Sequence, residues 1–270
     1  MTSILTNVGA MVALANLNRI LFDLDRTERR ISTGLRVNSP VDDAADFAIA
    51  QGLRSDIQAY DAVRQSLSSG TGLVSVAIAG ATSVSNLLAT IRATAIQAAN
   101  PANTAGQQSI LAANFAAQLQ QLNTFIASSV YNGRNLLSAN AASVSIISTI
   151  SGGTLTLANA SGVAGVSAAL SGGVATTAAA LALLSAIDAQ QLVVGTALGT
   201  LGAAQHAIDF QMTFTQSLSD ATRQGLGALV DANLAEESAR LQALLVQEQL
   251  AIQALNIANQ RPQLLLSLFR

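Results

Sequence analysis

The sequence predicts a mainly α-helical protein: a long antiparallel helical bundle or coiled coil formed by both ends of the chain, with a small β-hairpin insert in the middle. Three observations indicate this fold class. Half of the 270 residues are hydrophobic but only 3% are aromatic. Apolar residues recur at helical spacing near both termini, and the central residues 139–176 are rich in Ser, Thr, Gly, Ala and Val. Much of the apolar content is Ala and Leu, which are strong helix formers.

Two helices are predicted at the start of the chain. The first spans residues 4–33, where apolar side chains recur every three or four positions, and Gly and Pro within residues 34–40 end it. A second helix is predicted over residues 42–99, and at 1.5 Å per residue it would be roughly 85 Å long. Asp42 and Asp43 suit its N-terminus, because acids there interact favourably with the helix dipole.

Glycines interrupt the second helix in its middle. Gly70, Gly72 and Gly80 weaken the helical pattern, and residues 73–78 alone could also form a strand. We interpret Gly70 and Gly72, with the glycines from position 195 to 202, as positions that permit close contact between helices. A third helix is predicted over residues 105–129.

The middle of the chain changes from helix to strand. Residues 143–147 and 154–157 alternate in polarity, and two glycines lie between them, which predicts a β-hairpin near the surface. Two further helices follow, over residues 178–223 and 229–260, and a proline comes after the second. The apolar run at residues 178–204 contains Asp and Gln, so we interpret it as a packed helix and expect no membrane insertion.

Charge and composition exclude several classes of function. The net charge is −2, there is no Cys, and His206 is the single His. This composition provides no basic surface for nucleic acid, no disulfide, and no cluster of thiolates or imidazoles for a metal. No titratable side chain lies between Asn135 and Ile187. Asp42, Asp43 and Asp46 resemble a carboxylate cluster for a metal or an acid–base pair, but acids at a helix N-terminus are the simpler interpretation. We therefore expect no enzymatic activity, cofactor or metal.

The two terminal helices have apolar faces that neither can bury alone. We expect them to pack on each other, and the pair to pack on neighbouring copies of the chain. The residues predicted to take part in this terminal packing are Ile4, Val8, Met11, Leu245, Ile252, Leu255, Leu265, Leu268 and Phe269.

Four segments resemble bacterial flagellins. Residues 30–45, RISTGLRVNSPVDDAA, are similar to the family motif RLSSGLRINSAKDDAAG. Residues 95–100, AIQAAN, resemble the AVQSAN end of the family's first long rod helix, and residues 131–137, YNGRNLL, resemble its F/YNG-x-x-LL turn. Residues 254–270 resemble its terminal pattern LAQANQ-x-PQ-x-xLSLLR. Residues 230–239 are most similar to alphaproteobacterial flagellins.

The resemblance implies a domain organisation. Residues 1–36 and 229–270 would form the inner coiled-coil domain, residues 37–138 and 177–228 the helical rod domain, and residues 139–176 a short variable β-hairpin region. The outer domains of longer flagellins would be missing.

The resemblance also implies a function, a location and partners. The chain would be a structural subunit of the extracellular flagellar filament for swimming motility, exported uncleaved by the flagellar type III system. Its partners would be other copies of itself, an export chaperone, the filament cap and hook–filament junction proteins. A flagellin-related hook–filament junction protein is the alternative. The zinc-protease motif HExxH of some flagellins is absent.

Three groups of site residues follow from the resemblance. The connector between the inner and rod domains would contact neighbouring subunits through Arg30, Arg36, Asn38, Asp42 and Asp43, and Arg36, Asp42 and Asp43 would take part in charge-assisted hydrogen bonds. The positions that Toll-like receptor 5 recognises in many flagellins correspond to Thr90, Thr94 and Asn114, which depart from the recognised Arg, Leu and Glu. The uncharged middle would be either a plain polar hairpin or an O-glycosylated surface, with candidate sites at Ser143, Ser145, Thr154, Thr156, Ser161 and Ser171.

Overall fold

The computed structural model describes the backbone of residues 6–268 and the side chains of residues 6–260. The chain divides into two compact units. Unit 1 contains Met1–Ser55 and Ala221–Arg270, and unit 2 contains Asp56–Asp220. Two long helices, α2 (Ala44–Ala98) and α5 (Thr177–Val230), contribute residues to both units.

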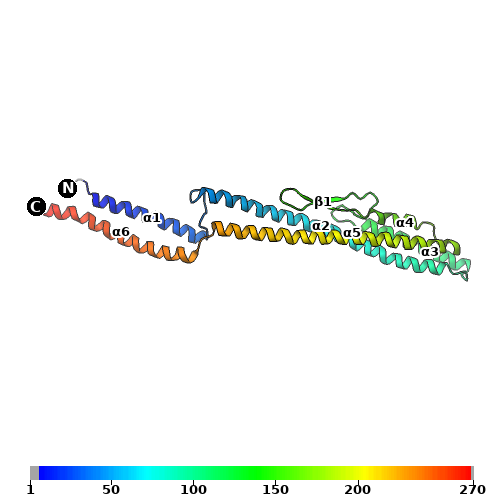
Figure 1. Ribbon diagram of the computed structural model, residues 1–270. Coiled ribbons are helices and arrows are strands. Elements are labelled where there is room, and N and C mark those ends of the chain that lie inside the picture. The colour runs from blue at the N-terminus through cyan, green and yellow to red at the C-terminus, as the bar shows by residue number, and fades with distance from the viewer. Residues whose placement is uncertain (1–5, 269–270) are drawn as a thin grey trace. The chain divides into compact units, whose positions relative to one another are not determined.

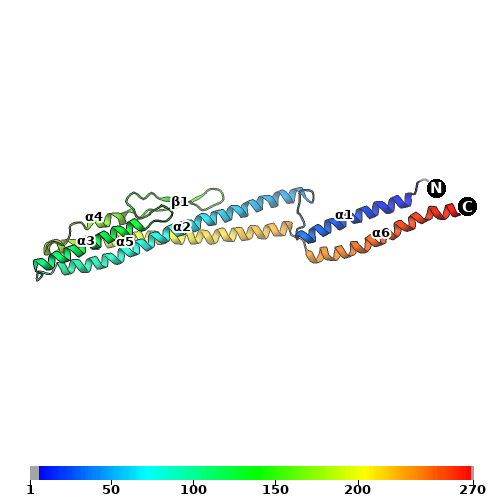
Figure 2. The same ribbon diagram turned by 180° about the vertical axis from the view of Figure 1, so that it is seen from behind.

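Unit 1 is built on a pair of helices from the two ends of the chain, α1 (Val8–Thr33) and α6 (Leu234–Leu268), which lie side by side (Figures 1 and 2). The pair is antiparallel. Asn7 caps the start of α1, accepting from the Ala10 amide at 3.1 Å and donating to the Ala258 carbonyl of α6 at 2.8 Å. Gly34 ends α1 in the left-handed conformation, with φ of 71°, as is common at a helix C-terminus.

Unit 1 has a small hydrophobic core next to the segments that connect α1 to α2 and α5 to α6. Val37, Ala50 and Val230 are buried together, and Phe47 and Leu226 pack against them. The connecting segments are therefore held by apolar contacts as well as by hydrogen bonds.

Unit 2 packs the rest of α2 and α5 with α3 (Ala105–Ser128), as Figure 1 shows. Its smaller elements are strands β1 (Val144–Ile147) and β2 (Thr154–Leu157), the 3₁₀ turn η1 (Ser161–Gly165) and the short helix α4 (Val166–Ala169). The strands form an antiparallel hairpin in which Val144 pairs with Leu157.

The hairpin lies over the long helices of unit 2. The Ile147 amide donates to Ser66 Oγ of α2 at 3.2 Å, and Gln211 Nε2 of α5 donates to the Ser148 carbonyl at 2.8 Å. Ile146, from β1, is buried against the helices. The hairpin predicted from alternating polarity is thus present at the predicted residues, with one apolar face inward.

The interior of unit 2 is a single aliphatic cluster with few aromatic side chains. Its largest fully buried members come mainly from α2, α3 and α5, and they include Leu67, Leu88, Ile91, Phe115, Leu122, Ile187, Leu201 and Ile208. By length and composition alone, α2 and α5 could cross a membrane, with mean hydropathy of 1.6 and 1.5 in their most apolar windows. Their apolar side chains instead supply this core.

Gly70, Gly72 and Gly80 do not interrupt α2, and the close helix contact expected at Gly70 is present, because a Cβ there would lie 3.5 Å from Ile208 Cδ1 of α5. A Cβ atom at Gly70 would lie 2.6 Å from Ile146 Cδ1, and one at Gly72 would lie 2.7 Å from the Tyr131 ring. A Cβ at Gly80 would overlap Ser129 Oγ. These glycines admit the hairpin, the turn at residue 131 and the C-cap of α3. Among the described residues nothing lies within 4 Å of such a Cβ at Gly195, Gly199 or Gly202, so the expected close contact is absent there.

Two predicted helix ends were wrong. The break expected at residues 224–228 lies at residues 231–233, because α5 continues through Gly225 and Gly227 to Val230. The last helix does not end at residue 260, since α6 continues to Leu268 through Pro262. Residues 73–78, which could also have formed a strand, lie within α2.

Candidate functional site: the connectors and the terminal helix pair

Two connectors lie next to each other in unit 1. Residues 34–43 join α1 to α2, and residues 231–233 join α5 to α6. Leu35 and Asp231 form an isolated antiparallel bridge. The Arg36 amide donates to the Val230 carbonyl at 2.7 Å, and the Ala232 amide donates to the Gly34 carbonyl at 2.9 Å. The backbone of one connector is therefore fixed by the other.

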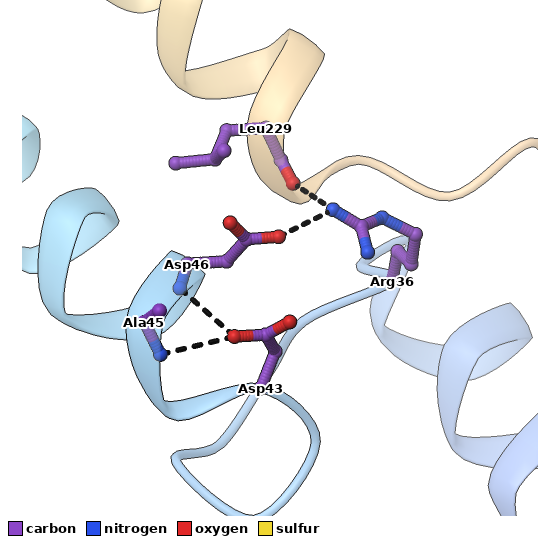
Figure 3. A network of polar contacts seen from close by, with 5 residues as sticks. All are labelled: Arg36, Asp43, Ala45, Asp46 and Leu229. Atoms are coloured by element: carbon purple, nitrogen blue, oxygen red, sulfur yellow. Dashed lines mark hydrogen bonds and ion pairs between the residues drawn. The ribbon is translucent and has the colours of Figure 1, made fainter.

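Arg36 adds a side-chain link across the connectors. Figure 3 shows its guanidinium between two helices, where Nη2 donates to Asp46 Oδ2 at 2.9 Å and to the Leu229 carbonyl at 2.6 Å. Leu229 is in the last turn of α5, whose carbonyls have no partner within the helix. One cation thus caps the end of α5 and pairs with an acid near the start of α2.

Asp43 is used in a helix cap. Its Oδ1 accepts from the amides of Ala45 and Asp46, both at 3.0 Å, at the first turn of α2 (Figure 3). A carboxylate in this position satisfies amides that have no partner in the helix and interacts with the positive end of its dipole. Arg36 pairs with Asp46 and makes no bond to Asp42 or Asp43 in the described structure.

Asp42 holds the loop before α2. Its Oδ2 accepts from the amides of Asn38 and Ser39 and from the Ser39 hydroxyl, at 3.3, 3.0 and 2.9 Å. Partial burial by itself raises the pKa of this carboxyl, but the hydrogen bonds from Ser39 and Asn38 and the nearby Arg29 charge outweigh it and bring the pKa below its ordinary value. The hydrogen bonds from Asn38 and Ser39 therefore stabilise the ionised form of the Asp42 carboxyl.

A second ion pair joins α1 to α6. Arg30 Nη1 lies 2.8 Å from Glu237 Oε1, and both side chains are largely buried. Arg30 Nε and Glu237 Oε2 are also buried, and neither has a hydrogen-bond partner among the described residues. The contact is therefore a single hydrogen bond and not a two-point one.

The predicted connector residues Arg30, Arg36, Asn38, Asp42 and Asp43 lie together in unit 1, but sequence reasoning missed three of their partners. Asp46 was interpreted as an acid at a helix start, and its pairing with Arg36 was not predicted. The Leu229 carbonyl carries no side-chain signal. Glu237 follows another Glu in the first turn of a helix. This pattern indicates acids that interact with the helix dipole, and it gives no sign that Glu237 forms a largely buried ion pair with Arg30.

The predicted packing residues of the terminal helices are exposed in the single chain. Val8, Met11, Leu245 and Ile252 are between 42% and 66% exposed, and Leu255 is half-buried. Ile4 and Phe269 lie outside the described residues, as do the side chains of Leu265 and Leu268. Among the described residues, the α1–α6 pair therefore leaves apolar surface exposed on both helices.

The remaining predicted site residues lie in unit 2. Thr90 and Asn114 are exposed, whereas Thr94 is buried, and its hydroxyl accepts from Gln118 Nε2 of α3 at 3.0 Å. The candidate modification sites other than Ser161 are exposed; Ser161 is half-buried, and Ser145 and Thr156 form a cross-strand hydroxyl pair at 3.4 Å. His206 is exposed and stacks on Phe210 with ring centroids 6.5 Å apart. Within the described residues no group of His, Asp and Glu side chains is arranged to hold a metal.

The sequence matches two family models. The bacterial flagellin N-terminal helical region matches residues 4–142, and the bacterial flagellin C-terminal helical region matches residues 184–269. Between them they leave out the segment with the hairpin and α4.

Relatives and a solved structure agree with these matches. Flagellin FljO of Caulobacter vibrioides is 32% identical, covering 100% of this chain and 99% of the relative. A flagellin of Brucella melitensis is 34% identical and covers 100% of both chains. The crystal structure of Bacillus cereus flagellin has the same fold, with a TM-score of 0.50 at 20% identity over 56% of this chain and 88% of that one. These matches show that the chain belongs to the bacterial flagellin family, whose members polymerise into the flagellar filament.

Proposed function

We propose that the chain, a filament subunit outside the cell, polymerises by burying the exposed apolar residues of α1 and α6 against neighbouring copies. The observation that carries this proposal is the exposure of Val8, Met11, Leu245 and Ile252 on the α1–α6 helix pair, since two helices alone cannot enclose them. Complete burial of one such side chain stabilises by up to about 1.5–3 kcal/mol. Several residues per copy therefore supply enough free energy to offset the loss of freedom on joining a filament.

A structural role is also supported by how the acidic residues are used. Asp43 caps α2, Asp42 fixes the connector loop, and Asp46 pairs with Arg36. Each of these three carboxylates therefore holds backbone amides or a cation in place. The family consists of structural proteins, and we infer that this chain has no enzymatic activity.

We further propose that the connector carries subunit contacts. Asn38 and Arg36 are exposed even though their neighbours Val37 and Asp42 are buried or half-buried. Internal bonds fix this segment, so its outward side chains are presented to a neighbouring copy with little loss of conformational freedom. We also propose that the chain is divided by function into an inner domain and a rod domain. The inner domain contains residues 1–36 and 229–270, and the rod domain contains residues 37–138 and 177–228.

Export and accessory partners form a separate proposal. A chain without Cys cannot form a disulfide that would hold it folded during passage through a channel. We infer export through the flagellar type III system without cleavage, assisted by an export chaperone, and contact with the filament cap and the hook–filament junction proteins. The mass of the filament protein tests whether export occurs without cleavage. A mass that shows loss of an N-terminal segment would contradict this part of the proposal.

The hairpin region is proposed to carry O-linked sugars. Ser143, Ser145, Thr154, Thr156 and Ser171 are exposed on a segment without charge, and such a surface tends to associate non-specifically unless polar groups cover it. An intact filament protein with the mass of the bare sequence would contradict this proposal.

Seeded growth tests the main proposal. Purified full-length chain is added to short filament fragments, and growth is followed by sedimentation and electron microscopy. We expect open-ended filaments, which would also separate a filament subunit from a junction protein present in few copies. Seeds that do not grow over a wide range of concentration would contradict self-assembly.

A further inference from the structure

We propose that the α1–α6 pair binds an inorganic phosphate ion, which accepts hydrogen bonds from Arg26 and Arg30 of α1 and from Arg240 of α6 and donates one to Asp23. All of these residues lie within unit 1. The proposal adds a small ligand to the filament subunit described above, and it requires no contact with another copy of the chain.

The site is a hollow of about 300 Å³ between the two helices. Its lining comes from one stripe of each helix: Asp23, Arg26, Thr27 and Arg30 of α1, and Arg240, Ala243, Leu244 and Gln247 of α6. Within each stripe the second, third and fourth residues follow the first by three, four and seven positions, which is the spacing of one helix face. The hollow is therefore formed by two faces that lie against each other.

The arginines approach the hollow from both helices. Arg30 Nη1 lies 2.8 Å from Glu237 Oε1, which fixes the level of α6 against α1. Because the helices are antiparallel, Arg240, about one turn beyond Glu237, lies near the level of the turn of α1 that carries Arg26. An anion between these side chains would therefore link the first helix of the chain to the last.

These arginines have N–H groups without an acceptor. Arg26 lies 5.2 Å from the centre of the Phe22 ring, and neither Arg26 nor Arg240 forms an ion pair or hydrogen bond with a described residue. Arg30 donates from Nη1 to Glu237, while its buried Nε has no partner among the described residues. A buried donor without an acceptor costs free energy, and Arg30 lines the hollow, so an acceptor placed there would reduce this cost.

The arrangement of the donors favours a tetrahedral oxyanion. Each guanidinium is a planar fork of N–H groups that suits the oxygens of a carboxylate or a phosphate. The two oxygens of a carboxylate lie in one plane, whereas phosphate oxygens point in several directions and can accept from forks on both helices. Thr27 and Gln247 add a hydroxyl and an amide that can also donate.

Asp23 favours phosphate over sulfate. Its side chain lines the same hollow and forms no ion pair or hydrogen bond with a described residue. An ionised carboxylate repels an anion unless the anion donates a hydrogen bond to it. Phosphate keeps a proton near neutral pH and sulfate keeps none, so only phosphate can donate to Asp23. The three arginines outnumber Asp23 and the neighbouring Glu237, so positive charge remains in excess.

A bound phosphate would form a second polar link between α1 and α6, next to the Arg30–Glu237 ion pair. A ligand that binds only the folded state stabilises that state, and the effect increases with ligand concentration. The phosphate concentration would therefore determine how firmly the two helices are held together.

Equilibrium dialysis with radiolabelled inorganic phosphate tests the site on the full-length chain and on filaments, with chloride at equal ionic strength as the reference. We expect saturable binding at a single site per chain. Arg26→Gln and Arg240→Gln should each weaken binding at least about tenfold, because each removes charge-assisted hydrogen bonds. Arg29→Gln is the control, since it removes the same charge from an exposed position of α1 outside the hollow and should bind like wild type. Binding that does not saturate, or that both hollow variants leave unchanged, would overturn the site.

Competition with sulfate and with glycerol phosphate identifies the occupant. Sulfate should compete at least about tenfold more weakly than inorganic phosphate, because it cannot donate to Asp23. Asp23→Asn should reduce this difference, since an amide can donate to either anion. Equal competition by the two ions in the wild-type chain would overturn the role of Asp23. Stronger competition by glycerol phosphate would overturn inorganic phosphate as the occupant and indicate a phosphate ester.

Hydrogen exchange shows where phosphate acts. Phosphate should slow amide exchange in residues 23–30 and 240–247 of the wild-type chain and leave these segments of Arg240→Gln unchanged. Phosphate and sulfate also strengthen apolar burial in general, but that effect would extend to unit 2 and to the variant. Seeds that elongate normally while the chain binds no phosphate would overturn the site alone, whereas phosphate binding without elongation would contradict the filament function alone.

Discussion

Arg30 of α1 and Glu237 of α6 form the ion pair that joins the first and last helices of the chain, with Nη1 and Oε1 2.8 Å apart. Removing one partner leaves a largely buried charge without compensation. We expect Glu237→Ala to destabilise the α1–α6 pair by about 2–4 kcal/mol. Thermal dissociation of variant filaments, followed by light scattering, should occur at a lower temperature than that of wild type.

The control for this pair replaces both partners. Arg30→Met with Glu237→Leu removes both charges and keeps apolar volume, and it should cost less than either single change to Ala. A double variant as unstable as the sum of the two single variants would show that the pair does not act as a unit.

Arg36→Ala should weaken filament assembly. It removes the bonds to Asp46 and to the Leu229 carbonyl, and because the guanidinium is partly exposed we expect a loss of about 1–2 kcal/mol. The critical concentration for seeded growth measures the effect. Arg36→Lys keeps the charge without the planar donor set and should give an intermediate value. Normal polymerisation by Arg36→Ala would contradict a role for this link.

The connector should lose stability in acid because of Asp42. Its pKa in the folded chain lies below the ordinary value of 3.8, so its contribution is complete above that value and disappears as the pH falls through the lowered pKa. Wild-type filaments should exceed Asp42→Asn filaments in stability near neutral pH, and the difference should disappear as the pH falls below 3.8 and through the lowered pKa. Thermal dissociation measured across this range tests the sign, and a difference that grows in acid would refute it.

Gly80→Ala should destabilise unit 2 although Ala favours helix. The new methyl group would overlap Ser129 Oγ and lie 2.9 Å from Leu137 Cδ1, and overpacking of this kind costs about 1–3 kcal/mol. The control is Gly199→Ala in α5, where nothing lies within 4 Å and up to about 1 kcal/mol should be gained. Thermal unfolding of the two monomeric variants should shift in opposite directions.

Toll-like receptor 5 should respond weakly to this chain. Thr90 and Asn114 are exposed without the expected Arg and Glu, and Thr94 is buried against Gln118 and offers no apolar anchor. Loss of a charged and an apolar anchor at an interface centre costs several kcal/mol. Purified monomer in a reporter-cell assay is the measurement, and strong signalling would contradict the prediction.

The positions of most elements could be predicted from local pattern, whereas the partners within the site could not. Alternating polarity gave the hairpin, and helical spacing gave the long helices despite Gly70, Gly72 and Gly80. The end of α5 was misplaced because Gly225 and Gly227 weaken a helix locally. That end is in fact set by Arg36, which binds carbonyls in its last turn from a distant part of the sequence.

Long-range pairing explains the other omissions. Glu237 lies 207 positions from Arg30, and no local pattern marks two such residues as partners. Asp43 accepts a hydrogen bond from a backbone amide at the start of α2, and Arg36 pairs with Asp46 instead. A proline usually ends a helix because it lacks an amide donor. The backbone of α6 nevertheless continues beyond Pro262.

The pairing of α1 with α6 also sets a condition on the order in which the molecule can fold. Asn7 and Ala258, which are bonded in the structure, are separated by 251 positions, so the first helix has no partner until nearly all of the polypeptide has been synthesised or has emerged from a pore. Joining such distant segments closes a long loop, which is a slow step. A chain cut short by premature termination would lack the complete helix pair, and we expect that it would not be added to the growing fibre.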